Sequence, residues 1–433
     1  IETVFDFSKD QGILRAAEKC NGTAACRKTE VIGGTMCPSY MATRDERNTT
    51  RARANILREF LTNSNHSNPF NHKEIYDVMD LCLSCKACKS ECPSSVDVAK
   101  LKAEFLQHYY DDNGAPLRSK LIANIGKINY IGSFIPSVTN LFLSNRYIAP
   151  IIMKAIGFEA KRSMPTLYKA TLDNWFRKNK PSAEAGQNHG KVYLFNDEFT
   201  RFNDTEIGIK TILLLTKLGF EVAIPKHLES ARTYLSKGFL RKAKVIANKN
   251  IRFLDPIINE KTPLVGIEPS AILTFRDEYP DLAEPMLKEA ADKLAKNSFT
   301  IEEFLFKAFN EGKISRDQFR DDEKELLYHG HCQQKSIAGT KEALGILSIP
   351  KGFRVKEIPS GCCGMAGSFG YEKEHYQLSM KVGELILFPM VRNSKPDTII
   401  VASGTSCRHQ IKDGTAKDAK HPVELLFEML KQS

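Results

Sequence analysis

The chain has 433 residues, of which 42% are hydrophobic, and a formal net charge of +10. This length predicts more than one domain, and no apolar run reaches the roughly 18 residues of a membrane-spanning helix. The basic residues are scattered and accompany no recognised nucleic-acid module, so the charge favours an acidic protein or an anionic lipid surface as partner and no nucleic acid.

Eleven cysteines fall in short clusters, which predicts metal ligation in a reducing compartment rather than disulfides. No signal peptide is visible. We therefore expect a cytoplasmic location, either free or peripheral at the inner face of the membrane. Because the chain begins with Ile1 rather than Met, we also expect a processed product or a piece of a longer polypeptide.

Residues 1 to about 180 are expected to be mostly helical and carry two cysteine runs. The first reads Cys20-Asn-Gly-Thr23-Ala-Ala-Cys26 and is followed by Cys37-Pro38. The second, residues 82–93, reads C-x2-C-x2-C-x3-C-P, the bacterial ferredoxin pattern in which the last cysteine ligates the other cluster. Zinc is the weaker alternative, because zinc sites usually carry two separated C-x2-C pairs.

The exchange of ligands that this pattern demands predicts two iron–sulfur clusters. The first takes four thiolates, from Cys37, Cys82, Cys85 and Cys88. The second takes three thiolates, from Cys20, Cys26 and Cys92. Thr23 stands where a fourth would be, so this site holds either a [3Fe–4S] cluster or a [4Fe–4S] cluster completed by another group. Its C-x5-C spacing resembles the [3Fe–4S] site in the iron–sulfur subunit of succinate dehydrogenases.

Three further segments of this half are expected to be helical. Residues 44–62 carry arginines that either offset cluster charge or form a solvated face: Arg44, Arg47, Arg51 and Arg53. Residues 95–110 show helical spacing after an N-cap candidate at Ser94 or Ser95. Residues 119–160 predict basic amphipathic helices that pack on the cluster domain, on a flavin-bearing partner or at a membrane surface. Residues 180–190 read as a linker.

The remaining sequence alternates strand and helix patterns, which predicts α/β layers. The expected strands are 192–195, 220–225, 263–269, 325–331, 353–359 and 398–403, and the clearest helices are 208–219 and 373–387. These strands form an internal repeat with an offset of about 134 residues. The loops after the strands carry four cysteines in the second half: Cys332, Cys362, Cys363 and Cys407.

The equivalent loops of the first half carry no cysteine and hold Asp197, residues 227–230 and residues 269–271. Loops at the carboxyl ends of strands are where α/β sheets place their sites. The second half is therefore expected to carry a site that the first half has lost.

The GCCG motif at 361–364 and the paired repeats resemble the cysteine-rich CCG domains of heterodisulfide reductases, glycolate oxidase iron–sulfur subunits and anaerobic glycerol-3-phosphate dehydrogenase subunits. Together with MCPSYMATRDE (36–46) and SGTSCRHQI (403–411), they look most like the carboxyl-terminal half of fused FAD/iron–sulfur D-2-hydroxy-acid dehydrogenases, a group that includes D-lactate dehydrogenases.

The resemblance implies an α+β multidomain fold. We expect a helical two-cluster ferredoxin-like domain (1–118), a helical linker segment (119–180), a degenerate CCG α/β repeat (191–320) and a CCG repeat with cysteines (321–433).

The function implied is electron transfer from a flavin that oxidises D-lactate, glycolate or D-2-hydroxyglutarate to a quinone, a cytochrome or another carrier. The sequence has no Gly-rich phosphate loop that opens a helix after a strand, so FAD is expected on a fused domain, which we prefer, or on a partner. No catalytic residue is assigned. Two alternatives remain: thiol–disulfide catalysis like that of heterodisulfide reductase, and a non-catalytic redox sensor.

The CCG site departs from its family pattern, because Gln410 replaces the last cysteine of a C-x2-C pair. Three interpretations of its four cysteines remain: they bind a third [4Fe–4S] cluster, they bind zinc, or they are metal-free redox-active thiols. Zinc would be helped by a histidine, with candidates at His329, His331 and His409. Adjacent Cys362 and Cys363 do not comfortably bind one ion together, which favours iron.

Overall fold

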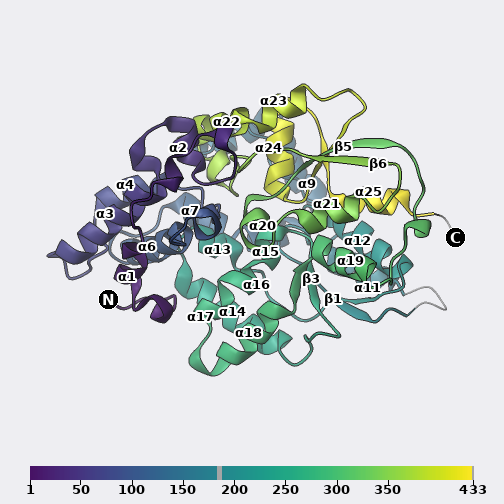
Figure 1. Cartoon of the computed structure of the whole chain (residues 1–433), viewed down its shortest axis with the longest axis horizontal. Coiled ribbons are helices and arrows are strands. Elements are labelled where there is room, and N and C mark those ends of the chain that lie inside the picture. Colours follow the sequence, from purple (N-terminus) through teal and green to yellow (C-terminus); the bar gives the residue numbers. More distant parts are fainter. Residues whose placement is uncertain (183–187, 432–433) are drawn as a thin grey trace.

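The computed structural model describes residues 1–182 and 188–431, so the predicted linker at 180–190 lies partly outside the described residues. Figure 1 shows the helical amino-terminal part in purple and blue, the first repeat in teal and the second repeat in green to yellow. Within the described residues, every strand lies after residue 190. The predicted division into a helical part and a later α/β part is thus visible in the element order.

The helical part begins with six helices that surround the cysteine runs. They are α1 (Ile13–Glu18), α2 (Pro38–Thr43), α3 (Thr50–Asn63), α4 (Lys73–Asp80), α5 (Ala87–Glu91) and α6 (Val98–Asn113). Their buried apolar side chains, among them Leu57, Ile75 and Phe105, share one core with the first repeat. The cluster-bearing loops therefore stand on a packed helical frame.

Two predicted helix starts are wrong, and capping explains both. The helix expected from residue 44 begins at Thr50, because the Thr49 side chain accepts a hydrogen bond from the Ala52 backbone N–H at 3.0 Å. The cap of α6 is Asp97, whose Oδ1 accepts from the Lys100 backbone N–H at 3.0 Å. Ser95, one of the two expected caps, instead adopts a left-handed conformation with φ of 48°.

Two four-stranded sheets follow, and all of their strands are parallel. The first has the order β2-β1-β3-β4, with β1 (Lys191–Phe195), β2 (Glu221–Ala223), β3 (Leu264–Gly266) and β4 (Ser298–Thr300). The second has the order β6-β5-β7-β8, with β5 (Lys324–His329), β6 (Phe353–Glu357), β7 (Ile399–Ala402) and β8 (Ala419–Lys420). The identical order bears out the repeat read from the sequence.

Helices cover both sheets. Those of the first unit are α12 (Thr205–Lys217), α13 (Arg232–Ser236), α14 (Leu240–Leu254), α15 (Pro269–Ile272), α16 (Thr274–Asp277), α17 (Tyr279–Leu282), α18 (Lys288–Lys296) and α19 (Ile301–Asn310). Those of the second are α20 (Cys332–Ile337), α21 (Lys341–Leu347), α22 (Tyr376–Leu385), α23 (Leu387–Arg392), α24 (Thr405–Thr415) and α25 (Pro422–Met429). One core joins the sheets, because α12 packs on α25 and α19 packs on α21.

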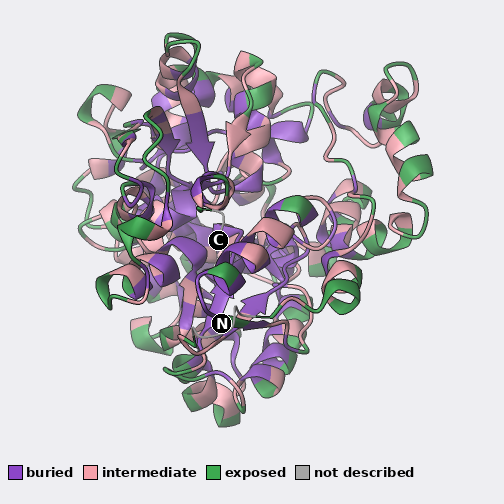
Figure 2. Ribbon diagram, turned by 90° about the vertical axis from the view of Figure 1, so that its right-hand side faces the viewer, coloured by how far each residue is buried: buried purple, intermediate pink, exposed green. Residues whose placement is uncertain are grey.

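The segment between the two parts forms α7 (Leu117–Ala123), α8 (Ile125–Gly132), α9 (Pro136–Ser144), α10 (Ile148–Ala155) and α11 (Leu172–Asn179). Its buried residues contact the repeats: Thr233 donates to the Ala123 carbonyl, and Met153 and Phe158 join the core of the second repeat. Much of its apolar surface remains exposed, and exposed segments stand out at the right of Figure 2. Among the described residues, no helix combines the length and apolar character that crossing a membrane requires.

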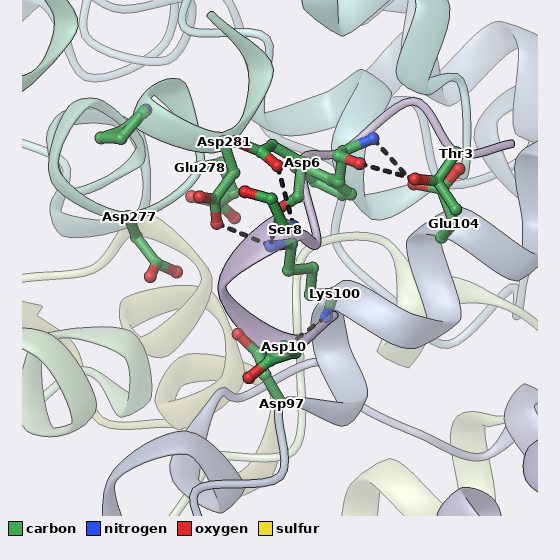
Figure 3. A network of polar contacts seen from close by, with 12 residues as sticks. Thr3, Asp6, Ser8, Asp10, Asp97, Lys100, Glu104, Asp277, Glu278 and Asp281 are labelled. Carbon is green, nitrogen blue, oxygen red and sulfur yellow. Dashed lines mark hydrogen bonds and ion pairs between the residues drawn. The ribbon is translucent and has the colours of Figure 1, made fainter. Parts of the chain in front are cut away.

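A network of polar contacts fixes the chain start to α6 and to the first repeat (Figure 3). The Glu104 carboxylate accepts from the backbone N–H groups of Val4 and Phe5 at 2.7 and 3.0 Å. Lys100 donates to the Asp6 carbonyl at 2.9 Å and to Asp281 at 2.7 Å. These bonds hold the helical part against α17.

Candidate metal centres

The four cysteines assigned to the first cluster come from two loops. Cys37 is the N-cap of α2, while Cys82, Cys85 and Cys88 lie in the loop after α4 and in the first turn of α5. Burial raises the pKa of Cys88 well above its ordinary value, and the nearby Cys82 and Cys37 thiols raise it further. Metal binding displaces the protons of such thiols, and a set of neighbouring cysteines from two adjoining loops is the donor type that iron–sulfur clusters use.

Arg53 places a buried positive charge beside the cysteines of the first set. Its side chain is 1% exposed, and its Nη1 lies 3.4 Å from the Cys37 sulfur. It donates further bonds to the Asn48 and Val78 carbonyls and to the Ser39 hydroxyl. Within the described residues it forms no ion pair with a carboxylate. A buried cation without a counter-ion is costly, so a thiolate-ligated cluster is the partner that would neutralise it.

Of the four arginines proposed for this role, the other three form surface ion pairs. Arg44 pairs with Glu30, Arg47 with Asp45 at 2.7 Å, and Arg51 with Glu46 at 2.6 Å. Burial lowers the pKa of Arg53, but the Cys82, Cys37 and Cys88 thiols outweigh burial and raise it. The solvated-face interpretation therefore fits three of the arginines, and the cluster interpretation fits the fourth.

The second set of cysteines is placed less compactly. Cys26 is buried, whereas Cys20 and Cys92 are half-buried after α1 and at the end of α5. Burial raises the pKa of Cys26, and bonding to the Arg51 backbone, at the start of α3, opposes that rise. Thr23 is exposed, and its backbone N–H donates to Asn21. Assembly of these three thiols around one cluster stays a prediction.

The four cysteines of the second repeat are all buried at the carboxyl edge of its sheet. Cys332 begins α20, Cys362 and Cys363 follow β6, and Cys407 lies in the first turn of α24. The adjacent Cys362 thiol lowers the pKa of Cys363 well below its ordinary value, with Cys407 and His329 contributing. The neighbouring thiols in turn raise the pKa of Cys362 and of Cys407, so the negative charge of the group is concentrated on Cys363.

One of the three candidate histidines converges with these thiols. His329, Cys363 and Cys407 each place one ligand atom within 4.8 Å of the others. The His331 side chain instead caps α20, and its Nε2 lies 3.9 Å from Glu268. Gln410, at the position of the missing cysteine, is buried and donates to the Ser379 carbonyl at 3.1 Å.

The second-repeat site adjoins the first cluster loop. The Ser336 hydroxyl donates to the Cys85 carbonyl at 3.2 Å, and Gln333 donates to the Ser84 carbonyl at 3.3 Å. After burial, the Cys332 thiol is the largest influence that raises the pKa of Cys85. Nothing in a spacing pattern relates segments so far apart in the chain, so this proximity could not be predicted from the sequence.

The charge network on the same loop could not be predicted either. Lys86, in the left-handed conformation between two ligand cysteines, is 3% exposed and pairs with Asp277 and Glu278 of the first repeat. Arg232 pairs with the same Glu278 carboxylate. The only sequence signal was a lysine inside the ligand run, and lysines are common in surface loops.

Comparison with known proteins identifies the amino-terminal cysteine segment as a family domain. A family model for the 4Fe-4S dicluster domain matches residues 19–97, the segment that holds all seven amino-terminal cysteines. No solved structure matches the chain.

The chain is similar over most of its length to several dehydrogenases. D-2-hydroxyglutarate dehydrogenase of Escherichia coli (strain K12) is 26% identical over 96% of this chain and 44% of its own length. One subunit of the anaerobic glycerol-3-phosphate dehydrogenase of the same organism is 24% identical over 74% of this chain and 79% of its own length. Lactate utilization protein A of Bacillus subtilis (strain 168) is 26% identical over 41% of this chain and 74% of its own length.

The chain thus spans less than half the length of the D-2-hydroxyglutarate dehydrogenases that it matches. The expected resemblance is confirmed by these similarities, and the structure has two parallel-sheet α/β units after the 4Fe-4S dicluster segment.

Proposed function

We propose that this chain transfers electrons from a flavin that oxidises a D-2-hydroxy acid: D-2-hydroxyglutarate, D-lactate or glycolate. The observation that carries the proposal is the buried Arg53, whose charge calls for a thiolate-ligated cluster within a dicluster segment. The names of the relatives, D-2-hydroxyglutarate dehydrogenase and lactate utilization protein A, support this substrate class.

The residues of the chain have separate tasks in this proposal. Cys37, Cys82, Cys85 and Cys88 hold a [4Fe–4S] cluster, and Cys20, Cys26 and Cys92 hold a [3Fe–4S] or [4Fe–4S] cluster with Thr23 at the gap. The clusters supply one-electron steps when bound. Arg53 stabilises the added negative charge, and the helical frame buries Cys26, Cys37, Cys85 and Cys88, which limits solvent access and so affects the potentials of the clusters.

FAD is carried by a fused domain or by a partner flavoprotein. The final acceptor is a quinone, a cytochrome or another carrier. Support comes from the glycerol-3-phosphate dehydrogenase relative, whose name makes it one component of a larger enzyme. We place the protein in the cytoplasm, with peripheral contact at the inner face of the membrane.

The membrane contact is supported by α8, α9 and α10. They expose large apolar side chains, with Ile131, Phe134, Tyr147 and Ile151 each 68–70% exposed. Residues 113–158 contain no acidic residue, and four exposed basic side chains lie among the apolar ones: Lys120, Lys127, Arg146 and Lys154. Exposed apolar groups with unopposed positive charge fit an anionic lipid surface.

The electron-transfer proposal is tested with anaerobically purified protein. The chain alone, given D-2-hydroxyglutarate, D-lactate or glycolate with an artificial acceptor, should show no turnover. The polypeptide that includes its flavin domain, or the chain mixed with its flavoprotein, should show cluster reduction by EPR after substrate is added. A Cys85→Ser variant should keep flavin reduction and lose electron delivery to the acceptor.

Two results would contradict the proposal. One is robust turnover by the chain without any flavoprotein. The other is a flavin that becomes fully reduced by substrate while the clusters stay oxidised, which would instead fit a redox sensor.

A further inference from the structure

One lysine of α6 lies against the entry of the first cluster loop. The Lys102 Nζ donates to the Cys82 carbonyl at 2.8 Å and to the Asp80 carbonyl at 3.2 Å. Cys82 is the first cysteine of the ferredoxin-like run, and Asp80 is the last residue of α4. Lys102 therefore holds the backbone at the point where the helix ends and the ligand run begins.

The charge of the half-buried Lys102 is not neutralised by a carboxylate. An ammonium group has three N–H donors, and the two carbonyls use two of them. In the part of the chain that the structure describes, no carboxylate forms an ion pair with this Nζ. The Asp80 carboxylate contacts His375 instead, at 2.7 Å. Lys100, two residues earlier on the same helix, shows the ordinary case, because it pairs with Asp281 at 2.7 Å.

The first cysteine of the ligand run is the main group that favours the charged form of Lys102. Burial lowers the pKa of Lys102, and the Cys82 thiol opposes burial more strongly than the Asp80 carboxylate does. Arg53 lowers the same pKa, because two neighbouring cations repel each other. Cluster binding converts the Cys82 thiol to a thiolate, which adds negative charge beside the ammonium group.

Arg53 and Lys102 hold one stretch of backbone from two different helices. Arg53 of α3 donates to the Val78 carbonyl at 3.1 Å and lies 3.4 Å from the Cys37 sulfur. Lys102 of α6 binds carbonyls further along the same stretch. Cations at the carboxyl end of a helix stabilise it, so capping of α4 is the simplest explanation of these bonds. Capping does not require two cations that both lack a carboxylate partner among the described residues. That arrangement is costly inside a protein unless a negative group joins them.

We infer that Lys102 is a positioning residue of the first cluster: it fastens the Cys82 backbone and, together with Arg53, stabilises the electron that the cluster accepts. Reduction adds one negative charge to the cluster, and a nearby cation lowers the free energy of the reduced form. Lys102 keeps its protons throughout, so the step moves one electron from the flavin and no proton. The inference rests on the proposed function, because it needs a cluster on the first set of cysteines.

Redox titration monitored by EPR, on the whole chain purified anaerobically, tests the inference. Lys102→Met keeps an unbranched side chain without the charge. It should lower the equilibrium constant for reduction of the first cluster at least ten-fold, which corresponds to about 59 mV for a one-electron couple. Lys102→Arg keeps the charge and the donors and should recover most of that loss. Lys102→Gln keeps an N–H donor without the charge and should behave like Lys102→Met. Lys73→Met, at a lysine of α4 whose side chain is 73% exposed, is the matched control and should leave the potential unchanged.

An unshifted potential in Lys102→Met, with full iron content, overturns the inference and leaves Lys102 as a cap of α4. A potential that Lys102→Gln restores overturns it as well, because the hydrogen bond would then matter and the charge would not. If Lys102→Met loses its iron, the other two variants decide: a lower potential in Lys102→Gln than in Lys102→Arg supports the inference, and equal potentials overturn it. A wild-type chain without iron overturns the proposed function and this inference together, whereas an unshifted potential in an iron-replete variant overturns this inference alone.

Discussion

His375 and Asp80 are 295 residues apart in sequence and share a 2.7 Å contact between imidazole Nε2 and carboxylate Oδ2. Asp80 ends α4, two residues before Cys82, while His375 precedes α22 in the second repeat. The Nδ1 of His375 lies 3.1 Å from Glu372, and its ring stacks on Phe369 with centroids 4.2 Å apart. A single imidazole thus bridges the first cluster loop and the carboxyl-terminal repeat.

This bridge predicts a pH dependence of stability. Burial lowers the pKa of His375, but Asp80 and Glu372 outweigh burial and raise it above 6.5. Because the pKa of His375 is higher in the folded than in the unfolded protein, its ion pairs contribute fully to stability below the unfolded-state pKa. That contribution is lost as the pH rises through the folded-state pKa. The free energy of unfolding should therefore fall in that window, by up to about 1.4 kcal/mol per pH unit.

Urea unfolding midpoints measured from about pH 6 upward, through the folded-state pKa of His375, check the prediction. His375→Gln should be less stable near pH 6 and should lack the fall, whereas substitution of the exposed His66 should leave the slope as it is. An identical slope in His375→Gln would show that the bridge does not titrate.

Arg53 should set the potential of the first cluster. Two charges about 4 Å apart interact by roughly 4 kcal/mol at an effective dielectric constant of about 20, and 59 mV corresponds to about 1.4 kcal/mol for one electron. Loss of the guanidinium in Arg53→Gln should lower the midpoint potential by on the order of 100 mV, because the reduced cluster loses a neighbouring cation.

EPR-monitored redox titration measures this shift. Arg53→Lys should recover part of the potential, and Arg47→Gln, whose side chain is 79% exposed, should leave it unchanged. A potential that does not move in Arg53→Gln, with full iron content, would remove Arg53 from the cluster environment.

Thr23→Cys should complete the second ligand set. Thr23 is exposed, so the substitution should cost little stability. If the native site holds three irons, total iron should rise from about seven to about eight and the oxidised-state [3Fe–4S] EPR signal should disappear. Thr62→Cys, an exposed site on α3, serves as the control. Eight irons already present in the unchanged chain would indicate a hidden fourth ligand.

The α8–α10 surface should bind anionic vesicles. Phosphatidylglycerol-containing vesicles should sediment the chain at low salt, and purely zwitterionic vesicles should not. Phe134→Ser combined with Ile151→Ser should weaken binding at least ten-fold, and Lys127→Glu should increase its salt sensitivity. Val31→Ser, at an apolar residue that is 88% exposed elsewhere, is the matched control. Failure to bind anionic vesicles would point to a protein partner on this surface.

The sequence was sufficient to predict features whose pattern lies within a short stretch of chain, such as ligand spacing and strand periodicity. The seven amino-terminal cysteines and six of the eight described strands could be identified because each pattern lies within a short window. Strand β8 was missed because two residues are too few for an alternating pattern, and β4 was missed because its sequence Ser-Phe-Thr holds a single apolar residue. They form at the ends of the sheets, where β3 and β7 offer a free edge.

The site chemistry was harder to predict because it depends on contacts between distant segments. Four arginines on one predicted helix look alike in sequence, and only the folded position of Arg53 puts its guanidinium at Cys37. Likewise, His329 and His331 are two residues apart, but β5 ends at His329 and the turn into α20 follows, so His329 lies near Cys363 whereas His331 lies near Glu268. Side-chain direction across a sheet edge cannot be read from spacing alone.

The pairing of Lys86 with Asp277 and Glu278 bears on how this protein can be divided for experiments. A fragment that ends near residue 180 would keep the lysine and discard both carboxylates. The ammonium group of Lys86, which is buried and paired in the full chain, would then be exposed and unpaired. The cluster loop that carries it would no longer pack against the first repeat. Expressing the dicluster segment alone should therefore give poorly folded or cluster-poor material, and the smallest useful recombinant unit extends at least through the first repeat.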